Sequence, residues 1–460
     1  MRSFIRARRM CDWQDFDNRA AFARSRLGHL EGERFPPFLL LAEPGLSATE
    51  QRVCSETWMH GRLAAAAESR AKLAFRFAPW DGGRTKIRLG YLSNDFHDHA
   101  TALLLIESLE AHDDTRFELH AYSYGKDDGK EMRARLRRAF DRFTDIGQFS
   151  DEEAANAINR DGIDILIDLK GFTQGTRTSI LALRPAPIQV NYLGYPGTLG
   201  PGLCDYIITD DFCTPAGNAQ DFSECFATLP HSYQPQGSCD AVALPPTRAA
   251  AGLPEQGFVF CCFNQAYKFT PAVFDVWCRL LQCVPGSVLW LLATGEAEGN
   301  LRGEAWKRGV DGSRLIFAGD LPHAEHLGRL QLADLVLDTA PYGAHTTASD
   351  ALWACVPVIT RPGATFPSRV AGSLLHAAGL PEMVVEDQDD YFELAFALAT
   401  DTKRLGGLRR TLAGNRLSAP LFDVKAYSLA LESLYSMMWE RHRLGLPPAA
   451  VRASAENSLS

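Results

Sequence analysis

The sequence predicts an α/β protein with two doubly wound domains behind a short helical segment. From residue 86 onward, apolar runs of roughly four to eight residues alternate with polar or helical stretches, which is typical of parallel strands covered on both faces. A Pro- and Gly-rich stretch at 235–256 separates these runs into two sets. Residues 1–85 instead have helical spacing and no β-branched runs. Ligands of such sheets bind outside the carboxyl ends of the strands, so function is sought in the loops there.

Composition and charge exclude several classes of protein. The chain has 460 residues, and its 47 Lys and Arg against 56 Asp and Glu give a net charge of −9. We therefore expect no nucleic-acid partner, because the phosphate backbone favours basic surfaces. No apolar run approaches the ~18 residues that a membrane helix needs, and no secretory signal is evident. The eleven cysteines lack a C-x-x-C spacing, which favours reduced thiols in a cytoplasmic protein.

The helical segment at 1–85 is predicted to contain two or three helices. Segments 17–31 and 48–78 have helical spacing, and the prolines within Phe35–Phe38 place a turn between them. At the other end of the chain, a strong helical pattern predicts a helix at 424–445. A Pro-, Ala- and Ser-rich tail at 446–460 is expected to be disordered.

The two α/β domains are predicted at 86–234 and 257–423, with 235–256 as the linker. The strand-like runs of the first domain are Ile87–Ser93, Phe117–Tyr124, Ile163–Leu169, Gln189–Leu193 and Tyr206–Thr209. Those of the second domain are Phe258–Phe263, Val288–Leu292, Leu315–Ala318, Leu335–Asp338, Val356–Thr360 and Met383–Val385. Each set is followed or interrupted by stretches long enough for helices, as a doubly wound sheet requires.

The richest candidate loop follows Leu335–Asp338 and runs to Asp350. Its small residues let a ligand approach the backbone, and Thr346 and Thr347 can cap the helix that starts there. A helix N-terminus with free N–H groups suits a diphosphate, and Asp350 can accept hydrogen bonds from sugar hydroxyls. The alternative interpretation is an ordinary capped helix with a tight turn.

A second candidate loop follows Phe258–Phe263. Thr270 and Pro271 have the residue types of a helix N-cap and first helical position. Lys268 comes just before them at a strand end, where a cation can neutralise a leaving phosphate. The alternative is a solvated surface lysine.

The loop after the first strand contains His97 and His99 together with two acids. Their i, i+2 spacing is not that of a helical zinc site, and no third ligand cluster is evident, so we expect no metal site. A histidine that acts as general base or orients substrate fits a βα loop better. A solvated or capping loop remains the alternative.

Taken together, these loops resemble the catalytic region of the O-linked N-acetylglucosamine transferases, glycosyltransferase family 41. The resemblance covers roughly residues 10–445. The segments that carry it are CDWQDFDNR (11–19), RLGYLSNDFHDHAT (88–101), LRPAPIQVNYLGYPGTLG (183–200), DYIITD (205–210), CFNQAYKFTP (262–271), VPGSVLWLL (284–292), HLGRLQLADLVLDT (326–339), HTTASDALW (345–353) and SAPLFDVKAY (418–427). It implies the GT-B fold, in which two Rossmann-like domains face a cleft.

The resemblance also implies an activity. It is an inverting, metal-independent transfer of N-acetylglucosamine from UDP-GlcNAc to Ser or Thr hydroxyls of a protein or peptide, with the UDP-sugar as substrate and no cofactor. The catalytic residues implied are His99, Asp161, Tyr267 and Lys268. The donor-binding residues implied are Gln265, Lys268, His326, Arg329, Tyr342, His345, Thr346, Thr347 and Asp350.

Three departures from the family pattern leave alternatives open. The animal enzymes carry a long tetratricopeptide array, whereas the helical segment here resembles only a terminal cap of one, so a separate partner is an option for acceptor recognition. Tyr342 stands where those enzymes have a small Cys near the N-acetyl group, and its bulk favours UDP-glucose or another sugar as an alternative donor. Plant relatives use GDP-fucose with a similar fold, so GDP-fucose is a further alternative donor. Asp164 replaces a His beside the active site. Transfer to Asn, or nucleotide-sugar binding with little catalysis, are further alternatives.

Overall fold

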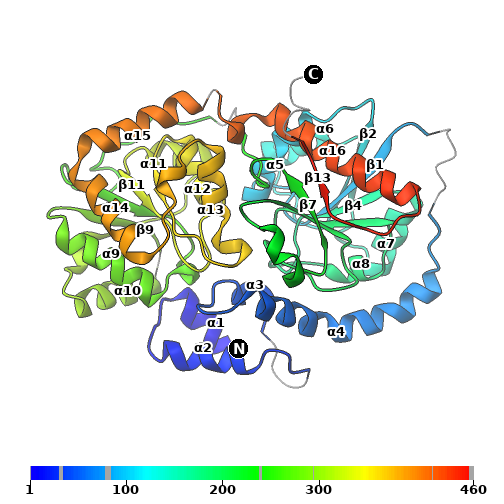
Figure 1. Ribbon diagram of the computed structural model, residues 1–460, viewed down its shortest axis with the longest axis horizontal. Coiled ribbons are helices and arrows are strands. Elements are labelled where there is room, and N and C mark those ends of the chain that lie inside the picture. Colours follow the sequence, from blue (N-terminus) through cyan, green and yellow to red (C-terminus); the bar gives the residue numbers. More distant parts are fainter. Residues whose placement is uncertain are drawn as a thin grey trace. The chain divides into compact units, whose positions relative to one another are not determined.

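The structure is a computed structural model that describes residues 2–30, 35–77, 84–237, 241–293, 295–416 and 418–454. The chain divides into two compact units, each built around one parallel sheet (Figure 1). Unit 1 comprises Met1–Ser25, Leu41–Leu46 and Ser238–Phe422. Unit 2 comprises Arg26–Leu40, Ser47–Gly237 and Asp423–Ser460.

Unit 2 contains an eight-stranded sheet in the order β13-β7-β6-β5-β4-β1-β2-β3, with every pair parallel. Its strands are β1 (Ile87–Ser93), β2 (Phe117–Ser123), β3 (Arg142–Asp145), β4 (Ile165–Asp168), β5 (Ile188–Asn191), β6 (Tyr206–Asp210), β7 (Cys225–Leu229) and β13 (Val451–Arg452). The strand order reverses between β1 and β4. This reversal is the topological switch point at which doubly wound sheets bind ligands.

The helices of unit 2 cover this sheet. They are α3 (Pro37–Leu40), α4 (Ala48–Leu73), α5 (Ala100–Glu110), α6 (Glu131–Ala139), α7 (Asp151–Arg160), α8 (Thr178–Ala182), η1 (Ala216–Asp221) and α16 (Val424–Arg443). Helix α16 packs against α5 and β7 (Figure 1). The Tyr427 hydroxyl on this helix meets the Tyr192 hydroxyl and donates to the Tyr233 carbonyl at 2.6 Å. These buried contacts explain why the last helix belongs to the first sheet.

Unit 1 contains a five-stranded sheet in the order β10-β9-β8-β11-β12, again with every pair parallel. Its strands are β8 (Val259–Cys262), β9 (Val288–Leu292), β10 (Leu315–Ala318), β11 (Leu335–Leu337) and β12 (Val358–Ile359). Strands β8, β11 and β12 are fully buried and β9 nearly so, as expected for strands covered on both faces, whereas the edge strand β10 is mostly half-buried. The switch point of this sheet lies between β8 and β11.

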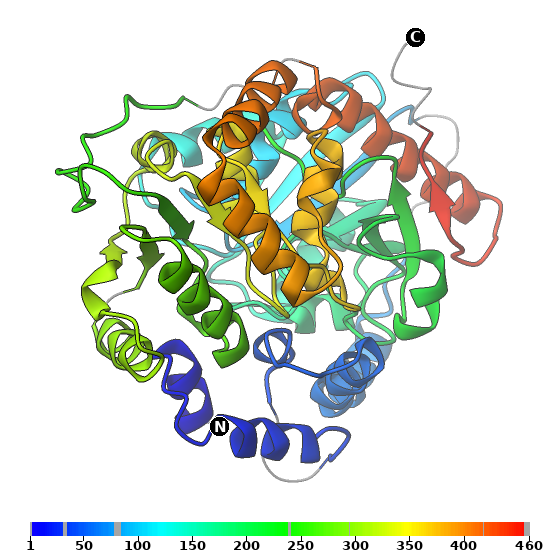
Figure 2. The same cartoon turned by 60° about the vertical axis from the view of Figure 1, so that its left-hand side comes forward.

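The helices of unit 1 are α1 (Arg2–Arg9), α2 (Phe16–Ser25), η2 (Ala266–Lys268), α9 (Pro271–Cys283), α10 (Glu296–Lys307), η3 (Gly312–Arg314), α11 (His323–Leu330), α12 (Thr346–Trp353), η4 (Phe366–Ser368), α13 (Val370–Ala377), η5 (Pro381–Met383), α14 (Gln388–Thr400), α15 (Thr402–Asn415) and η6 (Pro420–Phe422). Figure 2 shows α14, in orange, in front of the yellow strands of this sheet. The Tyr391 hydroxyl of α14 donates to the Asp338 carbonyl, just beyond β11, at 3.1 Å. None of the described helices is long and apolar enough to cross a membrane.

The helical segment differs from its prediction. Its described residues hold four helices, and α3 begins at Pro37 where a turn was expected, because proline is tolerated in the first turn of a helix. Its parts also divide between the units. In unit 1 the Cys11 thiol donates to the Ala266 carbonyl at 3.4 Å, whereas in unit 2 α4 packs on α8 through Met59 and Thr178.

The tail and the last predicted strand also differ from expectation. Val451–Arg452 forms β13, which pairs with the exposed edge of β7 and so satisfies backbone groups that an edge strand leaves open. Arg452 also pairs with Asp211, at 2.7 Å between Nη2 and Oδ1. Residues 455–460 of the predicted tail, and 238–240 of the linker, lie outside the described residues. In place of a strand at 383–385 there is a single bridge, between Thr360 and Val384.

Candidate active site

The switch point of unit 1 brings the two richest predicted loops together. Strands β8 and β11 are neighbours, so the loops that leave their carboxyl ends lie side by side. Lys268, in the loop after β8, donates from Nζ to the carbonyl of Gly343, in the loop after β11, at 2.8 Å. Its Nζ also lies 3.9 Å from the ring centroid of Tyr342, within range of a cation–π contact.

Lys268 is a buried cation, not the solvated lysine of the alternative interpretation. It is 8% exposed, and this burial lowers its pKa, while the charge of Asp338 acts in the opposite direction. Among the described residues it forms no ion pair, since its contacts are a carbonyl and an aromatic face. An ammonium held in this way favours an anionic ligand, because a ligand charge stabilises the charged form that burial disfavours.

Asp338 and Asn264 fix the loop that faces Lys268. The Asp338 carboxylate accepts from the Thr360 hydroxyl at 2.6 Å and from the N–H of Ala344 at 2.5 Å, and burial raises its pKa. Asn264 Nδ2 donates to the Thr339 hydroxyl at 2.8 Å. Neither residue was predicted to belong to the site. Their positions directly after strands β8 and β11 are the signal that could have found them.

Helix α12 begins at Thr346, and the residue before it, His345, is its N-cap. The expectation that Thr346 or Thr347 caps the helix is wrong, because both lie in its first turn and the Thr347 hydroxyl donates to Asn264 Oδ1. His345 Nε2 donates to the Pro367 carbonyl at 3.1 Å. Burial, with a smaller contribution from Lys268, lowers the pKa of His345 to about 3, so its ring is neutral at pH 7.

Tyr342 is the centre of the aromatic side of this site. It is 5% exposed, and its ring centroid lies 5.0 Å from that of His345 and 6.2 Å from that of Tyr267. Burial raises the pKa of Tyr267. Gln265 is exposed, and its carbonyl accepts from the N–H of Lys268 at 2.9 Å. Tyr342 thus lies beside the Lys268 ammonium, between His345 and Tyr267, and Gln265 joins Lys268 through the backbone.

The predicted nucleotide-binding residues form a second cluster between α11 and α12. Arg329 Nη2 donates to His326 Nδ1 at 2.9 Å, which leaves the His326 proton on Nε2, 3.8 Å from Asp350 Oδ2. His323 Nε2 lies 3.1 Å from Asp350 Oδ1. Burial lowers the pKa of His326 to about 4. A small cavity here is lined by Cys261, Cys262, Phe263, Asn264, His326, Leu330, Val336, Ala344 and Thr347.

The switch point of unit 2 holds the predicted His99. This residue is the N-cap of α5, and its Nδ1 accepts from the N–H of Thr101 at 3.2 Å. Asp95, in the same loop, has Oδ2 at 3.6 Å from His99 Nδ1 and at 2.7 Å from Nζ of Lys170, which follows β4. Sequence reasoning missed Lys170, although its place directly after a predicted strand end could have found it.

The comparisons with known proteins identify the family. Glycosyl transferase family 41 matches residues 10–238 and 234–431, which together are most of the chain. The chain belongs to glycosyl transferase family 41. It is 40% identical to the probable UDP-N-acetylglucosamine--peptide N-acetylglucosaminyltransferase SEC of Arabidopsis thaliana, over 82% of this chain and 40% of that protein. It is 31% identical to the UDP-N-acetylglucosamine--peptide N-acetylglucosaminyltransferase of Caenorhabditis elegans, over 95% of this chain and 48% of that protein.

The family 41 chain thus spans about half or less of the length of these curated relatives. Among solved structures it resembles a lysine-to-methionine mutant of the Thermobaculum terrenum O-GlcNAc transferase, with a TM-score of 0.79 and 30% identity over 88% of this chain and 76% of that one. It shares the fold of HepE from Anabaena in complex with UDP and glucose, at 14% identity and a TM-score of 0.52. Its fold is GT-B, with two parallel doubly wound sheets.

Asp161, a base candidate implied by the family 41 resemblance, does not join the other site residues of unit 2. It is the C-cap of α7 and precedes β4, so it lies at the amino edge of the sheet. His99 and Lys170 follow β1 and β4 at the carboxyl edge. Asp161 accepts from the Tyr122 hydroxyl at 2.9 Å and pairs with Arg142 at 3.0 Å, which is a structural role. Asp164 is likewise paired with Arg84, at 2.6 Å.

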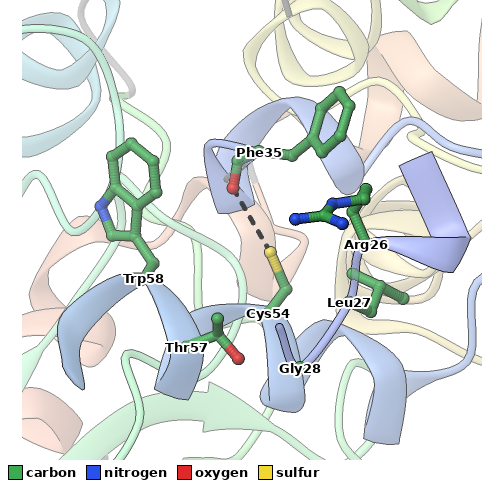
Figure 3. A pocket seen from close by; sticks show the side chains of 7 residues that line it. All are labelled: Arg26, Leu27, Gly28, Phe35, Cys54, Thr57 and Trp58. Atoms are coloured by element: carbon green, nitrogen blue, oxygen red, sulfur yellow. Dashed lines mark hydrogen bonds between the residues drawn. The ribbon is translucent and has the colours of Figure 1, made fainter. Parts of the chain in front are cut away.

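A further pocket of this family 41 chain lies in the helical segment of unit 2 (Figure 3). Its lining residues are Arg26, Leu27, Gly28, Phe35, Cys54, Thr57 and Trp58, and none of them is a predicted site residue. The Cys54 thiol donates to the Phe35 carbonyl at 3.6 Å, and burial raises its pKa to about 12. Such a thiol is unreactive near neutral pH. Among the described residues, no group of three or more His, Cys, Asp or Glu side chains is arranged to hold a metal ion.

Proposed function

We propose that this chain catalyses the inverting, metal-independent transfer of N-acetylglucosamine from UDP-GlcNAc to Ser or Thr hydroxyls of a protein or peptide. Its family and the names of its relatives support the donor and the peptide acceptor. The observation that carries the proposal is the buried ammonium of Lys268 at the switch point between β8 and β11, which forms no ion pair with any described carboxylate. That is where a GT-B unit binds a nucleotide diphosphate.

Lys268 stabilises the leaving group. When the glycosidic bond breaks, negative charge grows on the diphosphate, and a fixed cation in a dry site stabilises that charge more than it stabilises the ground state. The N-terminal turn of α12, with Thr346 and Thr347, adds backbone N–H groups and the positive end of a helix dipole. These groups supply the positive charge that a metal ion supplies in other transferases.

The remaining residues position the donor. His326 is neutral, and its ring centroid lies 5.6 Å from that of Phe263 with the two rings tilted by 46°. It offers a flat face to the uracil ring, with Arg329 alongside. Gln265 and His345 flank the diphosphate, Asp350 accepts from a sugar or ribose hydroxyl, and Tyr267 borders the sugar pocket. On the acceptor side, His99 offers Nε2–H to the reacting centre, and the acceptor hydroxyl attacks the anomeric carbon from the face opposite the UDP.

The test is UDP release from a panel of UDP- and GDP-sugars with acceptor peptides, read together with the mass gain of the peptide. The proposal predicts UDP release and an N-acetylhexosamine mass on Ser or Thr, unchanged by EDTA and lost in Lys268→Met. A matched control is Lys307→Met, which removes an exposed lysine of the same unit. UDP binding without transfer to any acceptor would contradict the catalytic part, and EDTA sensitivity would contradict the metal-independent part.

Tyr342 favours a second candidate, the same reaction with UDP-glucose. Its buried ring occupies space beside Lys268 and His345 in which an N-acetyl group would need room. Tyr342→Cys should therefore raise the preference for UDP-GlcNAc over UDP-glucose, measured as the ratio of the two kcat/KM values. An unchanged ratio would remove Tyr342 as the determinant of the donor sugar.

A further inference from the structure

Three residues at the switch point of unit 2 form a connected network of charges, here called the Lys170–Asp95–His99 network. Lys170 and Asp95 are buried, with side chains 5% and 7% exposed, and their Nζ and Oδ2 atoms lie 2.7 Å apart. The same Oδ2 lies 3.6 Å from Nδ1 of His99, whose side chain is 41% exposed. The Lys170–Asp95–His99 network therefore joins a buried cation to a surface-accessible imidazole through one carboxylate oxygen.

The hydrogen bond at the N-terminus of α5 fixes the tautomer of His99. Nδ1 accepts the N–H of Thr101 at 3.2 Å, so a neutral ring carries its proton on Nε2. If the ring gains a second proton, Nδ1 becomes a donor. It then loses the Thr101 bond and turns to Asp95 Oδ2. His99 thus has two states, and the charge available on Asp95 decides between them.

We propose that Lys170 is a positioning residue which neutralises Asp95 and thereby keeps His99 uncharged, with its Nε2–H presented to the acceptor side of the reaction. The catalytic consequence of this proposal rests on the proposed function, whereas the charge state of His99 does not. Without Lys170, an unpaired buried carboxylate would face His99 and draw a proton onto Nδ1. The ring would then carry a charge and leave the N-cap.

Among the charged groups around His99, Lys170 and Asp95 have the main influence on whether its ring is charged. His97 and Asp98 belong to its own loop, and Asp98 is exposed and pairs with Lys130 at 2.6 Å. Burial lowers the pKa of His99, Asp95 raises it, Lys170 and His97 lower it, and Asp98 raises it with the smallest effect. The carboxylate of Asp168, also buried, interacts with Asp95 and Lys170 and accepts from the backbone N–H groups of Lys170 and Gly171. Asp95, at 3.6 Å from His99 Nδ1, and its partner Lys170 are therefore the opposed buried charges that act on the ring.

The direct test is an NMR titration of the His99 ring in the full chain. In Lys170→Met the pKa of His99 should rise by about 1–3 units, the range expected for an opposite charge within about 4–6 Å. The double variant Lys170→Met with Asp95→Asn removes both charges and should return the pKa to near its original value, and Lys170→Arg should preserve it. A rise that persists in the double variant, or no rise in Lys170→Met, would overturn the proposal.

Two further measurements keep the proposal testable. If Lys170→Met does not fold, Asp95→Asn is titrated in its place. The pKa of His99 should then fall or stay the same, and a rise would contradict the network.

If wild type releases UDP, the acid limb of its pH–activity profile should move to higher pH in Lys170→Met by the same amount as the pKa of His99. It should return to its original position in the double variant. If the pKa of His99 shifts but the acid limb stays in place, the catalytic consequence is overturned, while the effect of Lys170 on His99 stands. If no donor is turned over, the proposed function fails and the titration still decides the network.

Discussion

Each unit places one buried lysine at its switch point, but the two lysines have opposite electrostatic surroundings. Lys268, after β8, bonds a carbonyl and lies over the ring of Tyr342. Lys170, after β4, contacts the carboxylate of Asp95. The first ammonium keeps its charge for a ligand, and the second is neutralised within the protein. Under the proposals made above, the same topology supplies a phosphate-binding group in one unit and a group that tunes a histidine in the other.

This difference teaches that a lysine at a strand end is not by itself a sign of phosphate binding. The role of such a lysine depends on whether a carboxylate lies within ion-pair distance. An ion pair neutralises the ammonium and so removes its long-range attraction for an anionic ligand. Asp338 raises the pKa of Lys268 from a distance, but it is bonded to Thr360 and backbone N–H groups. Within the part of the chain that the structure describes, the Asp95 carboxylate accepts from no such set of competing donors and pairs directly with Lys170.

The largest expected effect is on stability. Lys170→Met leaves Asp95 buried without its partner, and breaking a buried pair in this way costs about 3–5 kcal/mol of unfolding free energy. Lys268→Met breaks no ion pair and replaces a buried ammonium by an apolar chain of similar length, so its unfolding free energy should change much less. Urea unfolding of both variants measures the difference. Equal losses would show that the two lysines are not electrostatically distinct.

The next largest effect is on turnover. Lys268→Met should lower kcat by about 10²–10³-fold, the usual loss when one group that stabilises developing charge is removed. UDP affinity should fall less, because the ground-state diphosphate also meets the N-terminus of α12. Steady-state kinetics and calorimetric UDP binding give the two numbers. A loss of affinity as large as the loss of kcat would mean that Lys268 only binds.

A smaller effect is the alkaline limb of the activity profile. Burial lowers the pKa of Lys268 below its ordinary 10.5, so its charge, and with it turnover, should be lost on the alkaline side before an exposed lysine would titrate. The unfolded chain binds more protons over that interval, so the unfolding free energy attributable to this group rises with pH there. Lys268→Arg keeps its charge and should flatten the alkaline limb of the remaining activity. If the alkaline limb persists unchanged in Lys268→Arg, the titration of another group causes it.

The smallest effect concerns Asp161. Because it lies at the amino edge of its sheet, Asp161→Asn should change kcat by less than about threefold, as expected for a residue outside the reacting centre. It should still lower stability, since the carboxylate pairs with Arg142 and accepts from Tyr122. Assays of kcat and urea unfolding on one preparation separate the two effects. A loss of kcat as large as that in Lys268→Met would restore Asp161 as a candidate base.

Much of the fold could be predicted from the sequence, because buried parallel strands are continuous apolar runs. The runs at Ile87–Ser93, Val288–Leu292 and Leu315–Ala318 match the observed strands residue for residue. Strand β3 was missed because Arg142–Asp145 is short, partly exposed and polar at both ends. Strand β13 was missed because two residues carry no periodicity, and only the open edge of β7 makes them a strand.

The candidate site could be predicted only in part. The loops with Lys268 and with His345 to Asp350 were found because each follows an apolar strand and contains small or helix-capping residues. Asn264 and Lys170 each follow a predicted strand and Asp338 ends one, but their residue types alone do not separate them from solvated loop residues. Their roles come from neighbours far away in sequence, such as Thr360 for Asp338 and Asp95 for Lys170.

The most direct test of the central claim is the pH dependence of UDP release by wild type, Lys268→Met and Lys170→Met, across about pH 6 to pH 9, where a histidine and a buried lysine titrate. We predict that Lys268→Met is impaired at every pH, because it lacks the charge that stabilises the leaving group. Lys170→Met should be impaired at low pH and recover as pH rises and His99 loses its proton. Recovery of Lys268→Met at any pH, or a pH-independent loss in Lys170→Met, would contradict this account.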